Sequence, residues 1–145
     1  MATVNWTAFT DRGNLASTIL DTLADATLSA ASTALDNGTN KDTHAVIEIN
    51  LGSVTHVSPA YLELYMVKAP DATNYEEAPV IGGTDRNTLI ATIPVPAGAS
   101  ARRVMTGIIT LPPCTIKFYV GNQCGVTLAA SANTIDVYTA NLASA

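Results

Sequence analysis

The residues of this chain that are able to do chemistry are few and lie far apart. There are two histidines, His44 and His56, and two cysteines, Cys114 and Cys124. A zinc site needs about four ligands with close paired spacing, and a cysteine nucleophile needs a base and surroundings that lower its pKa. These four residues have no such spacing, so the sequence predicts neither a metal site nor thiol chemistry.

The acidic residues do not form a catalytic pattern either. The densest group, Asp71, Glu76, Glu77 and Asp85, lacks the alternating Asp/Asn spacing of a calcium loop and the strand placement of paired glycosidase carboxylates. The chain also lacks a nucleophile elbow, a Gly-rich phosphate loop and a metalloprotease motif. We predict that the protein is not an enzyme and has no catalytic residue, metal or cofactor.

Composition points to a domain whose surface is poor in charge. Apolar residues make up 48% and charged residues only 13% of the 145 residues, and the net charge is -5. Ser, Thr and Asn surfaces of this kind suit assemblies, because a hydroxyl or amide is easier to bury than a charge. Only seven Lys and Arg are present, which argues against nucleic-acid binding.

Two further classes are disfavoured by the order of residues. No stretch approaches the roughly 18 apolar residues of a membrane span, and the N-terminus lacks the pattern of a secretory signal. We expect a protein made in a cytoplasm. An extended segment between Cys114 and Cys124 would hold them about 20 Å apart, so we predict two free thiols.

Alternation of apolar and polar residues predicts the elements that carry these side chains. Strands are expected over residues 28–35, 43–51, 60–67, 88–95, 103–111, 115–120 and 134–139, with a hairpin turn at 121–125 and a returning strand at 126–130. A long loop separates residues 68 and 86. About eight strands without βαβ alternation predict an all-β fold, a β-sandwich that is jelly-roll-like.

The first part of the chain has a different pattern. Leu15, Ile19 and Leu23 recur every four residues, which favours a short helix. Trp6 and Phe9 precede it in a polar segment, where they either pack on their own domain or dock on a neighbour. We predict an N-terminal arm over residues 1–26 and a β-sandwich domain over residues 27–145.

Aromatic residues are the strongest candidates for a functional surface. Aromatics on an outer face are enriched at protein interfaces and also suit stacking on sugar rings, although cross-strand pairs can simply stabilise a sheet. Alternation predicts that the strand tyrosines point outward. The candidate interface residues are Trp6, Phe9, Tyr61, Tyr65, Tyr75, Tyr119 and Tyr138.

Three segments carry a resemblance to a known family: LDNGTNKD (35–42), DATNYEE (71–77) and LPPCTIKFYVGNQCGVTLAASANT (111–134). With the strands around them, they resemble β-sandwich capsid decoration (cement) proteins of tailed bacteriophages. In such chains Gly is more common at the position of Cys114, and a hydroxyl residue at that of Cys124. The first 25 residues lie outside the likeness.

The resemblance implies a structural protein of the virion that binds the outer capsid surface and stabilises the capsid lattice. It further implies the major capsid protein as partner, a homo-oligomer (commonly a homotrimer) and a location on the capsid exterior. The alternative is a carbohydrate-binding or host-attachment module of a phage head or tail fibre, with the tyrosines as sugar platforms.

Overall fold

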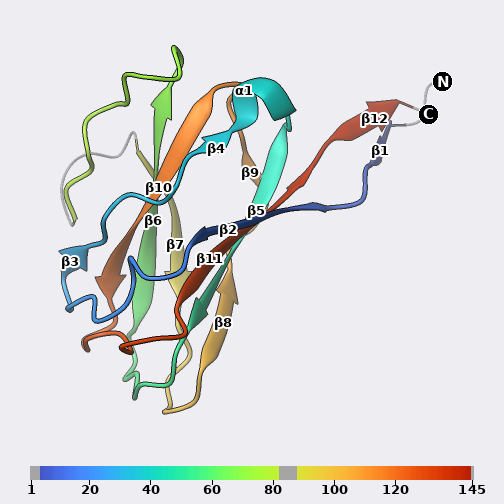
Figure 1. Ribbon diagram of the computed structural model, residues 1–145. Coiled ribbons are helices and arrows are strands. Elements are labelled where there is room, and N and C mark those ends of the chain that lie inside the picture. Colours follow the sequence, from blue (N-terminus) through green and yellow to red (C-terminus); the bar gives the residue numbers. More distant parts are fainter. Residues whose placement is uncertain (1–3, 82–87, 145) are drawn as a thin grey trace.

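The computed structural model describes residues 4–81 and 88–144, and its regular structure is almost entirely β-strand (Figure 1). Five strands form one antiparallel sheet: β3 (Thr27–Leu28), β4 (Leu35–Asp36), β6 (Tyr61–Ala69), β7 (Leu89–Pro94) and β10 (Thr115–Gln123). Their order is β3–β10–β6–β7, and β4 also pairs with β10. This layer is named the β6–β10 sheet.

The second layer, named the β5–β11 sheet, also contains five antiparallel strands. They are β2 (Thr10–Ala16), β5 (His44–Leu51), β8 (Arg102–Met105), β9 (Ile109–Thr110) and β11 (Thr134–Ala140). Their order is β2–β11–β5–β8, and β9 also pairs with β5.

Strand pairing is interrupted between β3 and β4 and between β8 and β9, and in both places side-chain hydroxyls accept hydrogen bonds from backbone N–H groups of the neighbouring strand. Between β3 and β4, the hydroxyls of Ser29 and Ser32 accept hydrogen bonds of 3.0 Å from the backbone N–H groups of Val120 and Phe118. Between β8 and β9, the hydroxyl of Thr106 accepts the N–H of Ile47 at 3.0 Å. Residues 27–36 and 102–110 therefore each follow one neighbouring strand along its length.

Counting each interrupted segment as one strand gives four positions in each sheet, eight in all. The chain changes sheet at every connection except that between β6 and β7, which are neighbours. This is the connectivity of a jelly roll. The predicted all-β, jelly-roll-like sandwich of about eight strands is confirmed.

The core lies between the sheets and is formed by alternate residues of the long strands. Each of these side chains is less than a tenth exposed, because strand side chains alternate between the two faces of a sheet. The inward positions predicted on β5, β6 and β10 are confirmed. Those positions are Ile47, Ile49, Leu51, Leu62, Leu64, Met66, Ile116, Phe118 and Val120.

The helix predicted from the spacing of Leu15, Ile19 and Leu23 is wrong. Residues 10–16 form β2, which pairs with β11 through two register shifts. These shifts, together with Gly13 at φ 86°, break the alternation, so the sequence shows no period of two there. Leu15 and Leu20 are buried in the core. Residues 10–16 therefore belong to the sandwich rather than to an arm extending to residue 26.

The hairpin turn predicted at residues 121–125 is also wrong. β10 continues through Gly121 and Asn122 to Gln123, and Gly121 pairs with β6 on one side and β3 on the other. Gly121 leaves room for the Ile81 side chain, because a Cβ at position 121 would lie only 2.9 Å from Cδ1 of Ile81. The buried Asn122 side chain donates to the carbonyls of Leu23 and Val126. Residues 126–130 form no returning strand.

The two ends of the chain pair with each other outside the sandwich. β1 (Val4–Trp6) and β12 (Leu142–Ser144) form an antiparallel two-stranded ribbon, named the terminal ribbon, which projects from the body (Figure 1). The single helix of the described residues, α1 (Asn37–Asn40), is capped by the side chain of Asp36. Within residues 4–81 and 88–144, no helix has the length and hydropathy to cross a membrane.

Candidate protein interface

A polar network fixes the place where the terminal ribbon leaves the sandwich. Thr7 and Asn141 are joined by two hydrogen bonds of 2.8 Å. The backbone N–H of Asn141 donates to the Thr7 hydroxyl, and the backbone N–H of Thr7 donates to the Asn141 carbonyl. The Asn141 side chain accepts the N–H of Thr43 at 2.8 Å and donates to Asp42 at 3.2 Å. Asp42 is buried and pairs with Arg12 at 2.7 Å. The ribbon is therefore anchored at its base to β2 and to the residues that lead into β5, both in the β5–β11 sheet.

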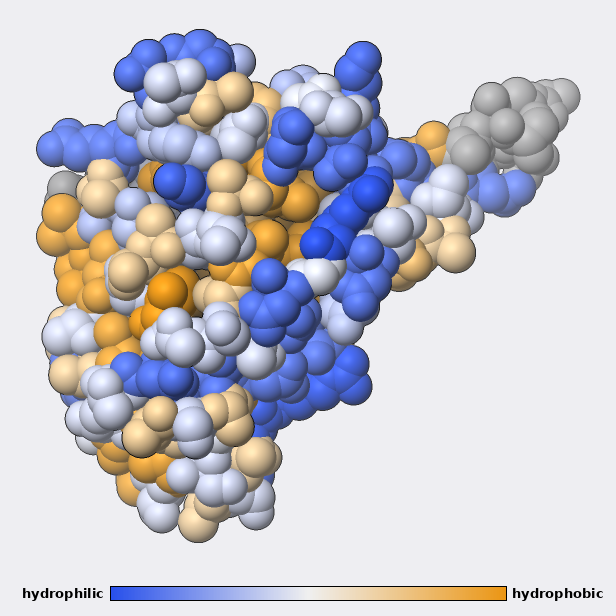
Figure 2. Space-filling view, viewed as in Figure 1, coloured by the Kyte–Doolittle hydropathy of each residue, from blue (hydrophilic) through white to orange (hydrophobic). Residues whose placement is uncertain are grey.

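Beyond this base, the ribbon carries large apolar side chains into solvent. Trp6 and Leu142 are directly opposite each other in the register and are 50% and 49% exposed. The Trp6 indole meets the ring of His44 edge-on, with centroids 4.8 Å apart. Figure 2 shows the ribbon standing clear of the body. A two-stranded ribbon is marginally stable alone, and this one has no charged side chain on either strand.

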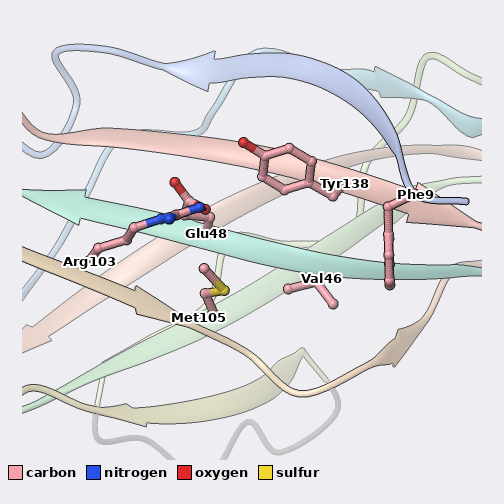
Figure 3. A pocket seen from close by; sticks show the side chains of 6 residues that line it. All are labelled: Phe9, Val46, Glu48, Arg103, Met105 and Tyr138. Carbon is pink, nitrogen blue, oxygen red and sulfur yellow. The ribbon is translucent and has the colours of Figure 1, made fainter.

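A shallow hollow lies next to the ribbon on the outer face of the β5–β11 sheet (Figure 3). Its volume is about 300 Å³. Phe9, which is 50% exposed, closes one side from the link between β1 and β2. This site is named the outer hollow. Its lining residues are Phe9, Val46, Glu48, Arg103, Met105 and Tyr138.

One ion pair forms the polar wall of the outer hollow. Glu48 is 6% exposed and Arg103 is 62% exposed, and their side chains meet at 2.5 Å. The hydrogen bond from Arg103, followed by that from Asn50, lowers the pKa of Glu48 despite its burial. The charge of Glu48 in turn raises the pKa of Tyr138. The site thus presents a neutral phenol and an exposed guanidinium beside an apolar floor.

The character of this face changes along the strands. Nearest the terminal ribbon it is apolar, with Val46 opposite Tyr138 in the register. Farther along, Asn50 donates to the hydroxyl of Thr134 at 3.0 Å and to the carboxylate of Asp136 at 3.3 Å. Apolar exposure is therefore concentrated at the end that adjoins the ribbon.

The outer face of the β6–β10 sheet is covered by the chain's own loop. The Lys117 ammonium lies 4.3 Å from the centre of the Tyr75 ring, and Ile81 packs over Gly121. Because residues 117 and 121 both point outward from β10, the segment between Tyr75 and Ile81 crosses this face. The described part of the loop, between Tyr75 and Ile81, therefore covers part of its own sheet.

This cover changes the interpretation of the tyrosines. Tyr65 was expected to be exposed, and that is wrong: it is 3% exposed, and its hydroxyl donates to Glu63 at 2.7 Å. Tyr61, Tyr75 and Tyr119 are half-buried on or over the same sheet. Of the predicted interface residues, Phe9 and Tyr138 meet in the outer hollow, with Trp6 on the adjoining ribbon, whereas Tyr65 and Tyr119 are register partners on the other sheet.

Sequence reasoning missed the aliphatic part of this surface. Met105 is 46% exposed and alternates with the buried Val104, so the period of two on β8 could have identified it. Leu142 has no such signal, because its exposure results from the pairing of the two chain ends. Val46 could not be identified from the sequence as an outer-face residue, because it follows the buried Ala45 in a continuous apolar run that shows no alternation.

The groups capable of covalent chemistry lie outside this surface. Cys114 and Cys124 are free thiols, as predicted. Burial raises the pKa of both, that of Cys124 to about 11, so both thiols are protonated near neutral pH. Within the described residues, no three His, Cys, Asp or Glu side chains gather closely enough to hold a metal. Neither thiol lies on the terminal ribbon or lines the outer hollow.

Comparison of the chain with protein-family models, curated proteins and solved structures finds no match.

Proposed function

We propose that this protein is a non-enzymatic structural protein of a virion, a decoration or cement protein that binds the outer capsid surface. Its partner would be the major capsid protein, and it would act on the capsid exterior after synthesis in the host cytoplasm. The observation that carries the proposal is the terminal ribbon. It leaves about half of each of the Trp6 and Leu142 side chains exposed, and the covered part of Trp6 includes its edge-on contact with His44.

The geometry of the ribbon favours docking over self-packing. Aromatic side chains supply large contact area with little loss of conformational entropy, and they are enriched in the centres of interfaces. The network around Asn141 and Asp42 holds the ribbon in one orientation. A rigid element of this kind loses less entropy on binding than a flexible arm.

The outer hollow extends the same surface onto the sandwich. Phe9 and Met105 are each about half exposed beside the ribbon, while Arg103 lies at the rim. An apolar centre with a charged rim is the usual anatomy of a specific protein interface. The opposite sheet face, beneath Tyr75 and Ile81, is already occupied by the chain's own loop.

Such binding would stabilise a capsid by mass action. A protein that binds the assembled lattice and not its separated subunits stabilises the lattice by RT ln(1 + [L]/Kd) per site. A homotrimer, which the family resemblance implies, would multiply weak contacts by avidity.

A glycan-binding role has less support. Tyr65 is buried and bonded to Glu63, so it offers no sugar platform, and Tyr61 and Tyr119 are half-buried beside it. Tyr138 is the strand tyrosine that lines the outer hollow.

Cosedimentation with capsids tests the proposal. The probe is a capsid assembled from the major capsid protein encoded nearest to this gene. We expect the wild-type chain to sediment with the capsids and the double variant Trp6→Ser/Leu142→Ser to remain in the supernatant. Val80→Ser is the matched control, because Val80 is 64% exposed in the loop over the other sheet.

Two results would contradict the proposal. One is a wild-type chain that never joins the capsid but binds a glycan array. The other is a double variant that sediments like the wild type, which would exclude the ribbon as the docking element.

A further inference from the structure

A buried histidine whose imidazole ring makes no hydrogen bond to the described residues lies at one end of the sandwich. His56 is 1% exposed, and neither of its ring nitrogens has a partner among the described residues. Buried polar groups are nearly always paired, because an unpaired one loses its bonds to water without replacement. An imidazole in this position calls for a functional explanation.

The backbone of His56 joins two connections between the sheets. Its N–H donates to the carbonyl of Gly98 at 3.1 Å, and the N–H of Gly98 donates back at 2.9 Å. Residues 52–60 lead from β5 to β6, and residues 95–101 lead from β7 to β8, so each segment crosses from one layer to the other. This pair of hydrogen bonds, named the His56 bridge, ties the crossings together.

The surroundings of the bridge are unfavourable for a second positive charge. Arg102 donates to the carbonyls of Pro96 and Ala97 at 3.0 and 2.6 Å, which straps its guanidinium over Gly98. Neither residues 52–60 nor residues 94–101 include an Asp or Glu. Arg102 is thus the charged group that acts on His56, and burial followed by the Arg102 charge lowers the pKa of this histidine.

We propose that His56 is a pH switch, whose protonation opens the His56 bridge and loosens this end of the sandwich in mildly acidic solution. The neutral ring fits the buried site, whereas an imidazolium would be buried beside Arg102 without a carboxylate partner. Opening exposes the ring to water, and the exposed imidazole then accepts a proton from solution. The inference concerns the sandwich itself and holds whatever partner the terminal ribbon binds.

The direction of the effect follows from linkage. The open form has an ordinary histidine pKa near 6.5, and the closed form has a lower pKa. Opening is therefore independent of pH well above 6.5 and increases as the pH falls from there toward the pKa of the closed form. Between about pH 7.5 and 5.5 the opening constant rises by about tenfold at most.

Hydrogen exchange and proton NMR on the intact chain test the switch. We expect protection of the His56 and Gly98 amides to fall by up to about tenfold between about pH 7.5 and 5.5, after correction for intrinsic exchange. The protein has two histidines, so both ring titrations can be followed. His56 should titrate below 6.5.

Variants separate the switch from general acid sensitivity. His56→Phe fills the site with an apolar ring and should abolish the pH dependence of exchange at Gly98. His44→Gln, which removes the histidine beside Trp6, should leave it unchanged. An ordinary pKa for His56 in the wild-type protein, or protection that does not change with pH, would overturn the proposal even if His56→Phe did not fold.

Discussion

Replacing Trp6 by Ala should weaken capsid binding strongly while leaving the domain folded. A tryptophan buries about 150–250 Å² when fully covered, and Trp6 is 50% exposed in the free chain, which leaves roughly 100 Å² for a partner to cover. At about 25 cal/mol per Å², this corresponds to about 2.5 kcal/mol, or roughly 70-fold in the dissociation constant of each site.

The cost to the free protein should be of the same order, because the covered half of the indole has about the same area as the exposed half. Trp6 makes one edge-on ring contact, with His44, and aromatic contacts of this kind are worth about 1 kcal/mol. A binding isotherm on capsids and a urea unfolding curve measure the two effects separately. Val80→Ala serves as the control, since it removes exposed apolar area from the loop over the other sheet.

The reasoning would be refuted by either of two results. If Trp6→Ala binds capsids as tightly as the wild type, the indole is not a contact. If the variant instead loses about 5 kcal/mol of unfolding free energy or more, the loss matches removal of a core aromatic, and Trp6 would be a packing residue of its own domain.

Further predictions concern the core, the thiols and the outer hollow. Phe118→Ala should lower the free energy of unfolding by about 3–5 kcal/mol in urea titration, since Phe118 is fully buried between the sheets. At pH 8, Ellman's reagent should react with half-buried Cys114 in the folded protein but with Cys124 only after unfolding, because the Cys124 thiol has a pKa of about 11. The lowered pKa of Glu48 contributes stability above its unfolded value near 4.5, and this stability is lost as the pH falls. Arg103→Ala should reduce stability at pH 7 and flatten the acid limb of a plot of melting temperature against pH; an unchanged limb would show that the ion pair does not hold Glu48 ionised.

The sequence was sufficient to predict the strands that are regular and half-buried. β5 and β10 alternate cleanly, since one face packs into the core and the other does not, and this pattern is what a period of two records. The same regularity supported the prediction of a sandwich.

Irregular pairing and long-range contacts defeated the same reasoning. β2 contains two register shifts and a positive-φ glycine, so its residues do not alternate. Gly121 and Asn122 are typical turn residues, but their roles are set by Ile81 and Leu23, which are distant in the sequence. The local preferences of residues for turns or strands carry no information about such contacts between distant parts of the chain.

The candidate interface could be predicted only in part for the same reason. Trp6 and Phe9 were identifiable because large aromatics in a polar terminal segment are unusual. Tyr65 is buried between neighbouring strands, opposite Tyr119 and Leu89, and Leu142 lies where the two chain ends pair. Neither arrangement leaves a periodic signal.

The most direct test of the proposed docking surface is hydrogen exchange of the protein bound to capsids, compared with the free protein. We expect slower exchange of the amides at residues 4–9 and 141–144 and around Val46, with little change at residues 70–81. Slowing confined to residues 70–81, or none at the chain ends, would contradict this expectation.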